Sequence, residues 1–398
     1  MILACLMLLW GSTVLSQKKT ITLGVAPHMD GGDQVEKNMY ALLGQWPGIE
    51  HIITPSDPDE LFDKLLEYEE KGYEIDGIVI AGHGSSDYPR IDLGEEPLDA
   101  SAVDVDTLQE EVDRLEKSVE DRRAKGLPTD RHEASLQENR ARIDRLNSIS
   151  KVMAPGAEVK LINCSPAATK EGETFVNNLA KVLVSDKGGK VVASKADVNV
   201  DQVTRLSGKL FATSSDGETV PLYDFFADGE WVQFPIPVTI DFDDVPTTYD
   251  ENAEKKKALL TGNEWAEKGV TFSAKKNLGT TSTVLGHTNY SSPPNGLTPG
   301  LPPWNRTGPE QGDNAEDSLT ITFTKPVLQA SITVIDNAPG RGDSITFFGE
   351  DGGILKTMSM GNGVYSHSEV RPAIKRILIK EEANDGDDVA YDDLSFSY

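Results

Sequence analysis

The 398-residue sequence has little cysteine and a shortage of positive charge. Only two residues are cysteines, and 38 Lys and Arg stand against 65 Asp and Glu, which gives a net charge of −27. Nucleic acids and anionic lipid surfaces recruit clustered Lys and Arg, so the composition argues against both as partners. The sequence also lacks a Gly-rich phosphate loop and any Cys or His cluster with zinc spacing.

One of the two cysteines lies in an apolar N-terminal stretch, Ile2 to Leu15, which is short for a membrane-spanning helix. Small residues follow at positions that a signal peptidase reads. We therefore predict a signal peptide over residues 1–16, a secreted or cell-surface protein, and no transmembrane span after its removal. A lipoprotein anchor at Cys5 is the less favoured alternative. After cleavage, Cys164 has no intramolecular disulfide partner.

The chain is too long for one ordinary core, and its patterning changes near Pro237. Residues 17–236 alternate strand and helix patterns, which predicts an α/β domain with a mainly parallel sheet and helices on both faces. Within it, residues 104–149 show the apolar spacing of a paired helix, and we predict an inserted helical hairpin with its turn at 126–130. The predicted strands of the sheet are 21–26, 49–54, 75–81, 159–163 and 190–194.

Residues 237–398 read differently, as short strand patterns separated by turns with no strong helix between them. This pattern predicts an all-β sandwich, jelly-roll-like in its strand order. Residues 277–313 are rich in Gly, Pro, Ser and Thr, and we expect a large loop there.

Two residues with nucleophile and base chemistry follow neighbouring predicted strands. His83, in Gly82-His83-Gly84, follows the third strand, and Cys164 follows the fourth. Reactive groups gather beyond the carboxyl ends of parallel strands, so we expect the imidazole to lie where it can take the proton of the thiol. The backbone N–H groups of Gly84 and Cys164 are the candidate oxyanion donors.

These residues and their order resemble the caspase-fold cysteine peptidases over roughly residues 19–202. The match is closer to uncharacterised caspase-like domains near the start of large bacterial surface proteins. The resemblance implies that His83 is the general base and Cys164 the nucleophile. The two lie 81 residues apart instead of the roughly 50 typical of caspases, and the inserted hairpin accounts for the surplus. Further counterparts are Asn163-Cys164-Ser165, Gly172, Phe175 and Val192-Ala193-Ser194.

In this family, loops after the first strand, the cysteine and the fifth strand line the specificity pocket. Here those loops carry Asp30, Asp33 and Asp197, which favours a basic P1 residue by charge pairing. Asp33 suits a helix N-cap equally well, and Asp30 suits a turn.

The sandwich resembles carbohydrate-binding modules, in which the first and last strands often pair. Such pairing gathers Asp241, Asp243 and Asp393 into an oxygen site suited to calcium. Solvated acidic strand ends explain the same residues equally well.

Two functions therefore stay open. The first is a secreted cysteine endopeptidase that acts on a protein or peptide through a thioester and needs no cofactor for the dyad. The alternative is an extracellular binding or adhesion protein, in which the caspase-like domain is catalytically silent and the sandwich binds a polysaccharide or another cell-surface ligand.

Overall fold

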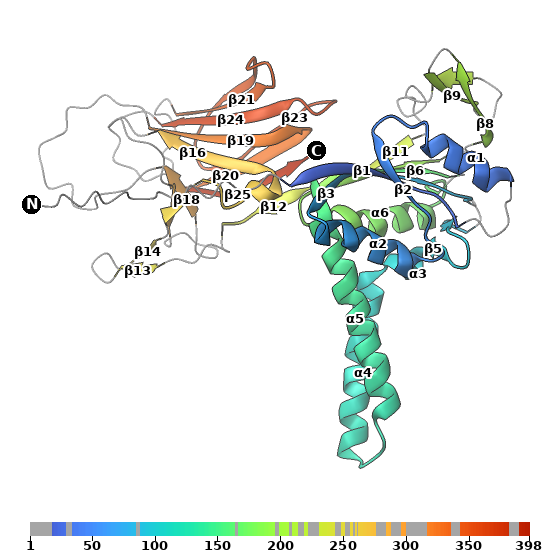
Figure 1. Ribbon diagram of the computed structural model, residues 1–398. Coiled ribbons are helices and arrows are strands. Elements are labelled where there is room, and N and C mark those ends of the chain that lie inside the picture. The colour runs from blue at the N-terminus through green and yellow to red at the C-terminus, as the bar shows by residue number, and fades with distance from the viewer. Residues whose placement is uncertain are drawn as a thin grey trace, which may run out of the picture.

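The fold is described by a computed structural model (Figure 1). The predicted signal peptide lies outside the described residues. The structure describes residues 18–28, 34–84, 88–163, 166–195, 199–206, 209–213, 219–221, 231–242, 248–250, 255–257, 259–260, 262–275, 284–287, 296–299, 317–335, 343–381 and 390–398.

A six-stranded sheet forms the N-terminal half, with the order β11-β7-β6-β3-β1-β2. Five strands run parallel, and β11 pairs antiparallel with β7 at one edge. The predicted parallel sheet is therefore present. Its central strand, Tyr73–Ala81, is buried from Gly77 to Ala81, as expected of a parallel strand with both faces covered. The strands are β1 (Lys19–Val25), β2 (Ile49–Ile53), β3 (Tyr73–Ala81), β6 (Met153–Ile162), β7 (Gly189–Ser194) and β11 (Trp231–Ile236).

Helices cover both faces of this sheet. Along β3, Ile78 and Ile80 belong to one buried cluster, and Val79 and Ala81 to another, as expected where successive side chains alternate between faces. The first cluster includes α2 (Pro58–Glu70), α6 (Lys170–Val184) and the base of the hairpin, and the second includes α1 (Gln34–Leu43).

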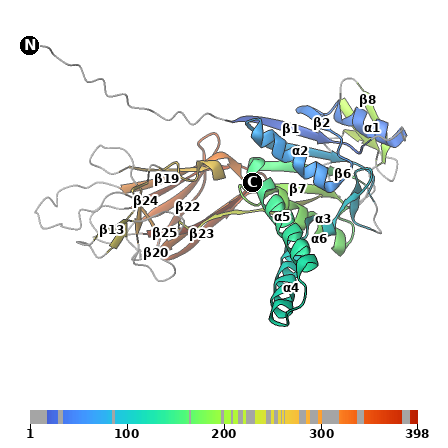
Figure 2. The same ribbon diagram turned by 60° about the horizontal axis from the view of Figure 1, so that its bottom comes forward.

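The predicted hairpin consists of α4 (Val105–Ala124) and α5 (Asp130–Val152), and Figures 1 and 2 show it projecting from the body of the protein. Its base is anchored in the core by Leu108, Val112 and Ile149. Further out, Arg123 and Glu133 form an ion pair of 2.9 Å across the two helices. A hollow of about 700 Å³ runs along this outer part and is lined mainly by charged and polar side chains.

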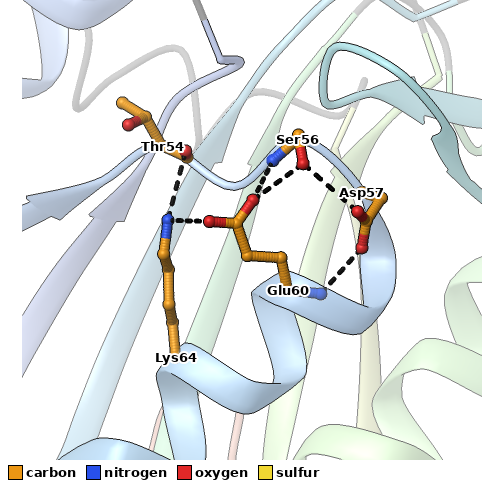
Figure 3. A network of polar contacts seen from close by, with 5 residues as sticks. All are labelled: Thr54, Ser56, Asp57, Glu60 and Lys64. Carbon is orange, nitrogen blue, oxygen red and sulfur yellow. Dashed lines mark hydrogen bonds and ion pairs between the residues drawn. The ribbon is translucent and has the colours of Figure 1, made fainter.

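The N-terminus of α2 is fixed by a network of polar contacts (Figure 3). Asp57 is the N-cap, and its carboxylate accepts from the backbone N–H of Glu60 at 2.8 Å. Glu60 in turn accepts from the backbone N–H of Ser56 at 2.7 Å and pairs with Lys64. The carbonyl of Ser56 also accepts from the backbone N–H groups of Glu95 and Glu96, so the network supports a second segment.

That segment is a small hairpin that the sequence did not predict, made of β4 (Arg90–Asp92) and β5 (Pro97–Asp99) and followed by α3 (Ala100–Val103). A separate antiparallel sheet follows β7 in the chain and contains β8 (Asn199–Leu206), β9 (Lys209–Thr213) and β10 (Thr219–Pro221).

The C-terminal half is built from antiparallel sheets that share one core, which agrees with the predicted β-sandwich. Aromatic rings from both sheets meet there, with Phe323 and Phe396 4.9 Å apart between ring centroids. One sheet contains β16 (Val270–Lys275), β19 (Asp317–Val327), β24 (Ile374–Glu381), β21 (Ser344–Gly349) and β22 (Ile354–Ser359). The other contains β15 (Leu259–Leu260), β17 (Val284–His287), β18 (Gly296–Pro299), β25 (Ala390–Ser397), β20 (Gln329–Ile335), β23 (Gly363–Ser368) and β12 (Val238–Ile240). The short elements β13 (Thr248–Asp250) and β14 (Lys255–Lys257) pair with each other, and η1 (Ala266–Lys268) precedes β16.

The C-terminal residue joins the two halves. Tyr398 is 5% exposed, and a Cβ added at Gly156 in β6 would lie 2.5 Å from its Cδ1 atom. Gly156 has φ of +65°, a conformation that suits glycine. Only Pro237 separates the last residue of β11 from the first residue of β12. One end of the sandwich is thus packed against the N-terminal half.

Candidate functional site

The strand register brings the carboxyl ends of β3 and β6, which precede the two predicted reactive positions, to the same edge of the sheet. Ala81 in β3 pairs with Ile162 in β6. His83 and Cys164 each follow their member of this pair by two residues, and adjacent strands lie about 4.8 Å apart. His83 is half-buried, whereas Cys164 itself lies outside the described residues. The register therefore supports the predicted neighbourhood, and the pairing of the two side chains stays a prediction.

A cavity of about 370 Å³ opens beside His83. Pro27 after β1 and His83 after β3 both line it, and the chain order reverses between these strands, with β2 on one side and β6 on the other. Ligands of open α/β sheets bind in the crevice at such a switch point. The charged lining comes from the β4–β5 hairpin: Arg90 and Asp92, paired at 3.0 Å, and Glu95.

The β4–β5 hairpin holds the His83 backbone in place. The N–H of Asp92 donates to the carbonyl of His83 at 3.0 Å, and Gly84 forms a bridge with Ile91. In this antiparallel pattern the flanking residues exchange the hydrogen bonds, so the ladder does not use the N–H of Gly84. The oxyanion role of the Gly84 N–H stays a prediction. Residue 82 must be a glycine for steric reasons, because a Cβ atom there would lie 2.8 Å from the carbonyl oxygen of Asp92.

The residues on either side of Cys164 are firmly held. Asn163 is fully buried, and its Nδ2 donates to the carbonyl of Gly82 at 2.9 Å. On the other side, the N–H of Ala167 donates to the carbonyl of Ser194 at the end of β7.

The N-terminus of α6 comes close to the same loop. Thr169 caps this helix by accepting from the N–H of Gly172. A Cβ at Gly172 would overlap the carbonyl oxygen of Pro166, which explains the glycine there. Pro166 is two residues from Cys164, and a nearby helix N-terminus favours the thiolate form of a cysteine.

Several predicted site residues lie outside the described residues, namely Cys164, Asp30, Asp33, Asp197 and Asp243. The basic P1 preference drawn from three of them stays a prediction. The sequence reasoning missed Arg90, Asp92 and Glu95. Polar and apolar residues alternate from Arg90 to Leu93, shortly after His83, and Gly94 follows. This pattern could have indicated a short strand with its polar side chains on one face.

The predicted pairing of the first and last strands of the sandwich is confirmed. Val238 pairs with Phe396, and Ile240 with Leu394. Asp241 and Asp393 directly adjoin the last of these pairs, whereas Asp243 lies outside the described residues. Within the described part of the chain, no group of three His, Cys, Asp or Glu residues is arranged to hold a metal ion. The calcium site stays a prediction.

The sandwich has one packed end and one outer end. At the packed end, Tyr398 contacts the N-terminal half. At the outer end, the register brings Ser344 and Ser318 to either side of Lys380 on β24. Lys380 is exposed, and Figure 1 shows this end pointing away from the N-terminal half.

Comparisons with known proteins add little. No protein-family model and no curated protein matches the sequence. A low-affinity xylan-binding module from Roseburia intestinalis matches at 13% identity over 35% of this chain and 93% of its own, with a TM-score of 0.19. A family 32 carbohydrate-binding module from C. perfringens, in complex with galactose, matches at 14% identity over 36% of this chain and 99% of its own, with a TM-score of 0.19. The K2 cleaved adhesin domain of Lys-gingipain matches at 10% identity over 41% of this chain and 99% of its own, with a TM-score of 0.21. TM-scores this low carry no argument about fold or function.

None of the described helices has the length and apolar character needed to cross a membrane.

Proposed function

We propose that this chain is an extracellular binding protein whose sandwich, residues 237–398, holds a carbohydrate, and whose caspase-like half, residues 17–236, packs against it. The observation that carries the proposal is the asymmetry of the sandwich. Tyr398 and its neighbours bury one end against β6, whereas Lys380 and the strand ends beside it face outward. Because the sandwich is held at its packed end, its outer end near Lys380 is accessible to a polysaccharide chain. The ligand class follows the sequence resemblance of residues 237–398 to carbohydrate-binding modules, and the binding assay decides it.

The test is binding of the full chain to xylan, galactose-containing glycans and other insoluble polysaccharides by pull-down, followed by calorimetry on any that bind. We expect Lys380→Glu, at the outer end of β24, to weaken binding. Lys375→Glu is the matched control, because Lys375 is on the same strand at the packed end, where its Nζ donates to the carbonyl of Thr324. Equal loss in both variants, or no polysaccharide bound, would contradict the proposal.

A second function, cysteine endopeptidase, is favoured by one specific observation. The β3–β6 register pairs Ala81 with Ile162, which precede His83 and Cys164 by two residues each, and His83 lines a cavity of about 370 Å³. In this function His83 takes the thiol proton and the Cys164 thiolate attacks the peptide carbonyl, with the Gly84 N–H helping to hold the oxyanion. The C–N bond then breaks as the amine leaves with the proton from His83, and water hydrolyses the remaining thioester. Asp92 and Glu95 line the cavity and are suited to a basic P1 side chain.

The test uses an Arg- or Lys-acyloxymethylketone probe on the full chain, with and without calcium. We expect Cys164→Ala and His83→Ala to abolish labelling. His28→Ala is the matched control, because His28 is an exposed histidine that follows the neighbouring strand β1. A probe that labels Cys164 only after denaturation would rule this function out.

A further inference from the structure

Asn163 is a polar side chain in a place where an apolar one would fit more simply. It is fully buried, directly before Cys164, and its Nδ2 donates to the carbonyl of Gly82 at 2.9 Å. Its Oδ1 atom is also buried and accepts no hydrogen bond within the described part of the protein. Burying an amide oxygen without a donor is costly, so its retention calls for a reason beyond packing.

The hydrogen bond that Asn163 does make ties together the two chain segments of the candidate dyad. Gly82 directly precedes His83, and Asn163 directly precedes Cys164. On its other side Gly82 is confined by β4, because a Cβ there would lie 3.0 Å from Cγ2 of Ile91. The His83 segment is therefore held between Asn163 and β4 and has little room to shift relative to Cys164.

We propose that Asn163 is a positioning residue, which fixes the His83 segment against Cys164 through the carbonyl of Gly82. The inference rests on the second function proposed above, the His83–Cys164 dyad. The amide nitrogen of Asn163 donates the hydrogen bond that holds the two segments together. Its amide oxygen is buried without a donor, which is an unfavourable consequence of placing an amide at this position. A leucine branches at the same atom, although it is larger, and it could not donate to Gly82.

The test measures how the alkylation rate of Cys164 by iodoacetamide depends on pH, in the full chain with Cys5→Ser so that only one thiol reacts. For the wild type we expect a midpoint below the usual value of about 8.5 for a free thiol. We expect both N163L and H83A to raise this midpoint, N163L by about one pH unit, which makes labelling about tenfold slower at pH 6. N163L removes the unpartnered oxygen but also leaves the carbonyl of Gly82 without its donor, so the melting temperature of each variant is measured beside that of the wild type.

I162V is the control, since it trims a neighbouring buried side chain in β6 and leaves the Asn163 tie intact. Its midpoint should match the wild type. N163A, which only shortens the side chain, gives the same readout if leucine is not accommodated. A midpoint unchanged in the Asn163 variants, with H83A still raising it, would overturn the inference and leave the dyad standing. Wild type and H83A titrating alike would remove the dyad and the inference with it.

Discussion

Replacing Glu60 with Gln tests whether the polar network at the start of α2 contributes to stability as its geometry indicates. Hydrogen bonds from Lys64 and from the backbone and hydroxyl of Ser56 lower the pKa of Glu60 from its ordinary 4.5 to about 2. A glutamine keeps the shape and one acceptor but loses the charge. The variant therefore isolates the ionised form.

The magnitude follows from that pKa. A fall from 4.5 to about 2 corresponds to about 3.4 kcal/mol before any allowance for solvent. The Glu60 side chain is 39% exposed, and screening of such pairs reduces the expected free energy to about 1 kcal/mol. Because the pKa is lowered in the folded state, this stabilisation is complete above pH 4.5 and is lost as the pH falls towards 2.

The assay is urea unfolding followed by circular dichroism between pH 7 and pH 3. We expect Glu60→Gln to be less stable than the wild type by about 1 kcal/mol at pH 7, with the difference shrinking towards pH 3. Glu67→Gln is the control, since its pair with Lys71 lies on the same helix but is 56% exposed on both sides. The free energy of unfolding should change less in Glu67→Gln than in Glu60→Gln. A Glu60→Gln difference that is independent of pH would refute the reasoning.

Three further predictions concern stability and use the same unfolding assay. Lys187→Ala should cost about 3 kcal/mol or more, because it leaves the carboxylate of Glu74, 2.7 Å away and 19% exposed, without its partner; a loss below 1 kcal/mol would contradict this. Gly156→Ala should destabilise more than Gly352→Ala, since both glycines have positive φ but only at Gly156 would the added Cβ meet Tyr398; equal losses would show that the contact does not matter. Burial raises the pKa of Tyr398 above its ordinary 10, so the wild type should lose stability as the pH rises past 10 and Tyr398→Phe should not; parallel curves would refute this.

The parts of the fold that the sequence predicted are those with strong local periodicity. The strands of the parallel sheet are long apolar runs, and the hairpin carries a regular seam that includes Leu108 and Val112. The missed elements have weak patterns. β4 and β5 have three residues each, too few to establish a period, and β23 has no fully buried side chain.

The candidate site divides in the same way. The matching positions of His83 and Cys164 follow from strand ends, which the sequence reveals. The charged lining of the cavity was missed, because the alternation from Arg90 to Leu93 is too short to indicate a strand by itself and the backbone hydrogen bond from Asp92 to His83 has no sequence signal. Asn163 was noticed only as a neighbour of the cysteine. Its tie to Gly82 depends on the register between β3 and β6.

The candidate site requires that the β3–β6 register bring residues 83 and 164 together. A disulfide tests the claim without requiring activity, because it forms only when two Cα atoms lie within about 7 Å. In a Cys5→Ser background, His83→Cys should form a disulfide with Cys164 on mild oxidation, detected by mass spectrometry of non-reduced peptides, and His28→Cys should form less. If His83→Cys and Cys164 both react with iodoacetamide but do not cross-link, the two positions are not neighbours and the candidate site is wrong.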